Sequence, residues 1–161
     1  ALFLVVGMLI ARRGSARVAD FGGVQKVAPV LAGVLLASGL SALALPGMGS
    51  FVSEFLVMAG SWQRYPVHTA IITLGTVLAA VYVLRMYLRT MTGPVTEQVS
   101  THVTTDLTSR EKAVIAPLLI LLIVFGFFPK PVLSMADEAA TQTMAVVGVT
   151  DPAPQVQEGN R

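Results

Sequence analysis

Hydrophobic positions along this chain are grouped into long runs that short polar segments interrupt. Several runs reach the roughly 20 residues that an α-helix needs to cross a bilayer. The pattern predicts an all-α fold, a polytopic transmembrane helix bundle, as a single membrane domain over residues 1–161. The expected segments are the end of a truncated helix at 1–11, a broken helix at 27–62, helices at 67–91 and 109–134, and a polar tail at 136–161.

The first run is too short to span, because residues 1–11 make only about 16 Å of helix. It also lacks the positive n-region and the cleavage pattern of a secretory signal. We expect it to be the end of a truncated transmembrane helix, and the sequence to be the C-terminal part of a larger chain.

The stretch Val27–Trp62 is the most informative segment. As one continuous helix it would be about 54 Å long, well beyond a hydrocarbon core of about 30 Å. Pro46 removes a backbone donor, while Gly47 and Gly49 permit unwound backbone. We therefore predict a discontinuous helix, broken around Leu45–Ser53. Lipid offers no partner to the freed backbone groups, so the break must lie within protein or beside water.

Glu54 is the only charged residue between Lys26 and Arg64. An ionised carboxylate is costly to desolvate within a membrane, so an intramembrane acid is typical of a proton or cation site. An alternative stays open, in which Val27–Leu45 is the whole span and Phe51–Gly60 is an interfacial helix with Glu54 facing water. Periodicity does not separate the two.

Three other polar residues are candidates for auxiliary roles. Ser50 and Ser53 can hydrate Glu54, although small residues also serve simply to let helices pack closely. His68, just past the turn that follows the broken stretch, can relay protons at the outer mouth or be an ordinary interfacial histidine.

Composition narrows the class of protein. Charged residues make up 12% of the chain, about half the fraction usual in soluble domains, which indicates an integral membrane protein. The chain has no cysteine, and its two histidines are far apart, so we expect no metal site and no cofactor bound by this chain. No basic run suited to nucleic acid is present.

Basic residues are distributed unequally between the two sides of the predicted bundle. By the positive-inside tendency, the richer side is cytoplasmic, which places loops 12–26 and 92–112 inside and the C-terminus outside. The inner set is Arg12, Arg13, Arg17, Lys26, Arg85, Arg89, Arg110 and Lys112, and the outer set is Arg64, Lys130 and Arg161. Thr108 and Glu111 have capping-box spacing and mark the start of the last predicted helix.

Several short motifs together resemble one family. They are Asp20-Phe21-Gly22-Gly23, Leu45-Pro46-Gly47 with Phe51-Val52-Ser53-Glu54-Phe55, Ala79-Ala80-Val81-Tyr82, Arg110-Glu111-Lys112 and Phe128-Pro129-Lys130-Pro131. With them, nearly the whole chain resembles the C-terminal part of the subunit M family of bacterial NADH-quinone oxidoreductase, respiratory complex I. The second motif is the most specific of the set.

The resemblance implies an antiporter-like, proton-translocating subunit in the bacterial inner membrane. By the same resemblance, Glu54 matches the acid that exchanges protons with the outer side. The implied partners are lipid and the other membrane subunits of the complex, while FMN, iron–sulfur clusters and quinone would be bound by partner subunits. Two alternatives remain, namely a subunit of a multisubunit cation/proton antiporter and a purely structural membrane scaffold.

Overall fold

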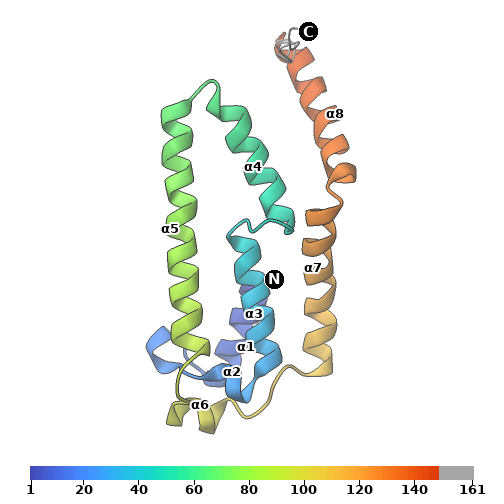
Figure 1. The fold of residues 1–161 in the computed structure, drawn as a ribbon. Coiled ribbons are helices and arrows are strands. Elements are labelled where there is room, and N and C mark those ends of the chain that lie inside the picture. The colour runs from blue at the N-terminus through green and yellow to red at the C-terminus, as the bar shows by residue number, and fades with distance from the viewer. Residues whose placement is uncertain (149–161) are drawn as a thin grey trace, which may run out of the picture. The chain divides into compact units, whose positions relative to one another are not determined.

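The computed structural model describes residues 1–148, and over these residues the chain is helical and contains no strand. The predicted all-α class is therefore confirmed (Figure 1). The elements are α1 (Leu2–Arg13), the 3-10 helix η1 (Val18–Asp20), α2 (Val24–Val27), α3 (Pro29–Ala42), α4 (Gly49–Trp62), α5 (Pro66–Met91), α6 (Glu97–His102), α7 (Ser109–Phe127) and α8 (Lys130–Val147).

The helices fall into two compact units, the first running from Ala1 to Phe127 and the second starting at Phe128. The core of the first unit is formed where α1, α2, α3, the end of α5 and α6 meet, and buried residues of the connecting loops and of α7 complete it. Its fully buried side chains are apolar and medium-sized, and they include Val5, Val24, Leu31, Leu35, Met91, Val99 and Val103.

The discontinuous helix is present. α3 ends at Ala42 and α4 begins at Gly49, so the interruption comprises residues 43–48 (Figure 1). It therefore begins before Leu45, and Gly49–Ser53, which we expected within the break, are already helical. Each half has 14 residues and is about 21 Å long.

α5 is, among the described residues, the one helix that is long and apolar enough to span a membrane by itself. Its 26 residues make about 39 Å of helix. Most of its apolar side chains lie on the surface of the single chain rather than in its core. It matches the helix predicted at 67–91 to within one residue. Its first residue, Pro66, fits the first helical turn, where no backbone donor is needed.

The last predicted helix and the tail differ from the prediction. The helix expected at 109–134 is divided into α7 and α8, because the chain breaks at Phe128 and Pro129. The tail expected from residue 136 is helical up to Val147, followed by Gly148 in the left-handed conformation that commonly ends helices. Alanine, methionine and glutamine favour helix even where the mean hydropathy is low. Residues 149–161 of that predicted tail lie outside the described residues.

Candidate functional site

The interruption between α3 and α4 is built from two successive turns. At the end of α3 the Ala44 amide donates to Ser41 O (3.2 Å) and the Leu45 amide donates to Leu40 O (3.3 Å). This is the Schellman pattern, with Ala44 at φ 50° in a position that glycine usually fills. The backbone of α3 is thus capped before the chain leaves the helix.

The second turn is made by Pro46 and Gly47. The Met48 amide donates to Leu45 O (3.0 Å), so Pro46 and Gly47 occupy the two central positions of a β-turn. Gly47 has φ 93°, as the third residue of a type II turn requires. The prediction that Pro46 and Gly47 break the helix is therefore supported by a specific turn chemistry.

Glycines on α7 and at the break bring these two parts of the chain into close contact. A methyl group added at Gly126 would overlap the carbonyl of Gly47 and stand 2.7 Å from the Met48 amide nitrogen. A methyl group at Gly49 would lie 3.0 Å from Cβ of Phe125. We call Gly47, Gly49 and Gly126 the glycine junction. It covers the unwound backbone with protein, as a break within a membrane requires.

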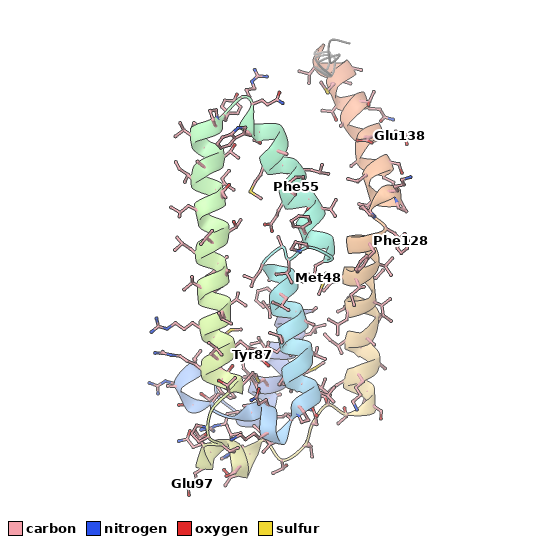
Figure 2. All side chains as sticks on the ribbon, viewed as in Figure 1. Met48, Phe55, Tyr87, Glu97, Phe128 and Glu138 are labelled. Carbon is pink, nitrogen blue, oxygen red and sulfur yellow. The ribbon has the colours of Figure 1, made fainter. Side chains whose placement is uncertain are left out.

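Glu54 lies on α4 shortly after the break, and its side chain is half-buried. It lines a cleft of about 430 Å³ together with residues from the end of α3 and from the facing side of α5. Most of the lining is apolar, while Ser53 and Thr76 are hydroxyl-bearing residues of the same lining. Figure 2 shows Met48 at the junction of the two half-helices and Phe55, the neighbour of Glu54, on α4.

The other predicted site residues are placed differently. Ser50 Oγ donates to Ser41 O across the break, so this side chain bridges the two half-helices. Ser53 Oγ donates to Ser50 O (2.9 Å) within α4 and also lines the cleft. His68 is exposed at the start of α5, edge-on to Tyr65 with ring centroids 5.9 Å apart. It does not line the cleft that Glu54 lines.

A second polar group lies inside α3. Ser38 is 2% exposed, and it is the one buried side chain in the described part of the chain whose polar atom has no hydrogen-bond partner. It is on the same helix face as Leu31 and Leu35, which belong to the apolar core. An unpaired hydroxyl in such surroundings destabilises the folded state.

An ion pair lies near the first residues of α3, at the helix end opposite the break. Arg12 donates to both carboxylate oxygens of Glu111, over 2.8 Å and 2.6 Å, and their side chains are only 11% and 23% exposed. Arg12 also donates to the carbonyls of Met8, Thr105 and Asp106. One guanidinium thus joins α1 to the loop before α7 with bidentate geometry.

Asp106 completes this cluster, which we call the polar clamp (Arg12, Asp106 and Glu111). Its carboxylate accepts from the amides of Val30 (2.8 Å) and Leu31 (2.9 Å) in the first turn of α3. Burial of Asp106 opposes its ionisation, but these amides and that of Leu107 outweigh burial and hold its pKa below the usual value. A residue far along the chain therefore caps α3.

The capping box predicted at Thr108 and Glu111 is confirmed. Glu111 Oε2 accepts from the Thr108 amide (2.7 Å), and Thr108 Oγ1 accepts from the Glu111 amide (3.4 Å). The pKa of Glu111 falls from its usual 4.5 to about 2, first because Arg12 donates to the carboxylate and second because the Thr108 amide does. Glu111 is therefore ionised at neutral pH.

Sequence reasoning missed Gly126 and the roles of Arg12 and Asp106. Gly126 was detectable in principle, since it is the only glycine in the apolar run Ala113–Phe128, where glycine weakens a helix and suggests a packing reason. Arg12 and Asp106 gave no comparable signal. Their partners lie on other segments, and no local periodicity connects them.

Part of this chain matches the model of a known protein family. Residues 1–79 match the family model described as NADH:quinone oxidoreductase/Mrp antiporter, TM. The matched segment contains the break and Glu54.

Similar curated proteins cover nearly all of the chain. A protein of Mycobacterium tuberculosis (strain H37Rv) named NADH-quinone oxidoreductase subunit M is 50% identical over 97% of this chain and 28% of its own length. Proteins of the same name are 38% identical over 83% of the chain in Rickettsia felis and 34% identical over 86% in Escherichia coli (strain K12). Each of these two matches covers 27% of the relative, so the chain spans only about a quarter of their length.

Proposed function

We propose that this chain works within a proton-translocating membrane subunit of NADH-quinone oxidoreductase, because residues 1–79 match the model of the NADH:quinone oxidoreductase/Mrp antiporter family. Similarity to proteins named subunit M over most of the chain supports the oxidoreductase rather than the antiporter branch. In this proposal the chain is the C-terminal part of a larger subunit. The complex performs NADH:quinone oxidoreduction, with FMN, iron–sulfur clusters and quinone bound by partner subunits.

The observation that carries the proposal is the position of Glu54. A half-buried carboxylate lines a mostly apolar cleft beside an interrupted helix, and two hydroxyl-bearing residues line the same cleft. Such surroundings make the cost of ionisation sensitive to how much water enters. In this proposal Glu54 exchanges a proton with water that enters the cleft.

The energy that this step needs is modest. Moving one charge against about 100 mV costs about 2.3 kcal/mol. A neighbouring charge that moves by a few ångströms in a medium of low dielectric constant changes the energy of a carboxylate by a similar amount. Quinone reduction elsewhere in the complex can thus drive proton release from Glu54 through rearranged charges, with no redox group near the carboxylate.

We further propose the topology that the basic residues predict. Loops 12–26 and 92–112 face the bacterial cytoplasm, the C-terminus faces outward, and the apolar surface of α5 contacts lipid or neighbouring membrane subunits. The polar clamp then lies on the cytoplasmic side, and Glu54, on the outer half of the broken helix, exchanges its proton outward. Single cysteines at Arg17 and Gln63, labelled by a membrane-impermeant thiol reagent in whole cells, test this topology. Labelling only at Gln63 is expected.

The test of function is Glu54→Gln, which keeps the shape of the side chain and removes its ability to ionise. In vesicles that carry the assembled complex, we expect NADH-driven proton uptake and quinone reduction to be largely lost. The matched control is Glu97→Gln, because Glu97 is an exposed carboxylate at the start of α6, away from the cleft (Figure 2). Full activity of Glu54→Gln with normal assembly would refute the proposal and favour a scaffold.

The antiporter alternative is separated by a second measurement in the same vesicles. An imposed sodium or potassium gradient without NADH would drive proton movement through a cation/proton antiporter. We expect no such movement beyond that of vesicles lacking the protein.

A further inference from the structure

Gly126 lies directly against the unwound segment between α3 and α4. The atoms that a methyl group at Gly126 would overlap or crowd are the carbonyl of Gly47 and the amide nitrogen of Met48. These are backbone atoms, so they cannot rotate away as the end of a flexible side chain can. Only glycine lets α7 approach the break this closely.

The break presents glycine to α7 as well. A methyl group at Gly49 would stand 3.0 Å from Cβ of Phe125 and 3.5 Å from the carbonyl oxygen of Leu122. Gly47 cannot carry a side chain without strain, because its φ of 93° lies in the left-handed region. The contact between α7 and the break therefore depends on glycine on both sides.

The carbonyl of Gly47 gives the contact a polar component. Among residues 1–148, no N–H or O–H group donates to this oxygen. The hydrogen on Cα of Gly126 that takes the place of a side chain points at it, because a methyl group in that direction would overlap the carbonyl. A Cα–H···O contact of this kind is weak, yet it recurs where helices pack closely.

We propose that Gly126 is a positioning residue for proton transfer at Glu54. By holding α7 against the break, it fixes the spacing between α3 and α4 and thereby the place of Glu54 at the cleft. This inference rests on the proposed function, because it concerns the same carboxylate. The specific claim is that the geometry of the break is set from α7, by a residue that is not itself part of the cleft lining.

Three alanine variants of the intact protein form a graded test. Gly126→Ala places a methyl group where backbone atoms of the break lie, and Gly49→Ala places one against Phe125. The methyl group of Gly60→Ala has no atom within 4 Å. Gly60 is the matched control, since it lies on α4 outside the break. In vesicles with the assembled complex, we expect the number of protons moved per quinone reduced to fall about tenfold in Gly126→Ala. It should fall by a smaller factor in Gly49→Ala and stay unchanged in Gly60→Ala.

This ratio separates positioning from a merely structural role. A variant that only lowered the amount of assembled complex would reduce proton movement and quinone reduction together and leave their ratio unchanged. An unchanged ratio in Gly126→Ala would therefore overturn the inference. If Gly126→Ala does not assemble, the ratio measured for Gly49→Ala decides in the same way.

A second readout does not depend on proton transfer. Hydrogen–deuterium exchange over residues 43–52 is expected to accelerate about tenfold in Gly126→Ala and to stay unchanged in Gly60→Ala, since overpacking favours local opening. Unchanged exchange in Gly126→Ala would also overturn the inference. Loss of activity in Glu54→Gln together with normal behaviour of Gly126→Ala would leave the proposed function intact and remove only the positioning role.

Discussion

The two ends of α3 are held in opposite ways. At its first residues, Asp106 accepts from two backbone amides, and Arg12 links the same loop to α1 and Glu111. At its last residues the chain turns twice, and α7 approaches through the glycine junction. The first end is held by an ion pair and by hydrogen bonds from distant residues, whereas the second is held by local hydrogen bonds of the turns and of Ser50 and by the close steric fit of α7.

This difference indicates which end can change state. Breaking the polar clamp leaves charges unpaired in a partly buried place, which is costly, so that end is expected to stay fixed. Separating two glycine surfaces costs little beyond lost packing. Of the two ends, the break is therefore the one that a misfit displaces, so the place of Glu54 depends on the fit of Gly126, while the clamp keeps the opposite end of α3 fixed.

The largest effect is expected from Arg12→Ala, which removes five hydrogen bonds and leaves the Glu111 carboxylate without its cation. We expect a loss of about 3 kcal/mol in the free energy of unfolding, seen as a lower thermal midpoint of the intact protein in detergent. Arg17→Ala, at an exposed position, is the control. Equal midpoints for the two variants would show that the clamp does not hold this end.

Acid weakens the clamp less than Arg12→Ala does, because Arg12 keeps its bonds to carbonyl groups. The pKa of Glu111 is about 2 in the folded chain and about 4.5 when unfolded, so the stabilisation is complete above pH 4.5 and disappears as pH falls through 2. Thermal midpoints measured from pH 6 down to pH 2 should fall less steeply in Glu111→Gln. Parallel curves for the two proteins would contradict this.

A smaller loss is expected from Asp106→Ala, which leaves the first-turn amides of α3 without their side-chain acceptor. Helix caps of this kind contribute about 1 to 2 kcal/mol. Asp106→Asn keeps one acceptor oxygen and should fall between the wild type and Asp106→Ala in thermal midpoint. Asp137→Ala, at an exposed position of α8, is the matched control and should leave the midpoint unchanged.

The smallest effect, and the only gain, is expected from Ser38→Ala. Removing a buried hydroxyl that has no partner relieves an unmet desolvation cost, so stability should rise by about 1 kcal/mol or less. Ser100→Ala, at an exposed position of α6, serves as the control for the serine-to-alanine change itself. A lower thermal midpoint in Ser38→Ala would show instead that the hydroxyl is hydrogen-bonded in the membrane.

The sequence was sufficient for features that local chemistry determines. Pro46 and Gly47 define a turn, Thr108 and Glu111 form a capping box, and α5 follows from one uninterrupted apolar run. In the same way, Glu54 was identifiable as the lone charge of its stretch. That Glu54 carries protons remains a prediction.

Features that depend on distant segments were not accessible. The bond from Arg12 to Glu111 joins residues 99 positions apart, and that from Asp106 to Val30 joins residues 76 apart. The extra helix α8 was missed for a different reason. A polar composition was interpreted as lack of structure, although helix propensity does not require apolar residues.

An interrupted helix has four ends instead of two, and this brings the ends of two peptide dipoles into the middle of the stretch. Peptide dipoles add up along a helix to about half a positive charge at its first turn and half a negative charge at its last. α4 begins at Gly49 without a side-chain cap, so its positive end lies at the end of the break. A continuous helix would have no such end there. Such an end acts within about one turn, so it polarises the break itself, in a stretch that has no basic residue between Lys26 and Arg64.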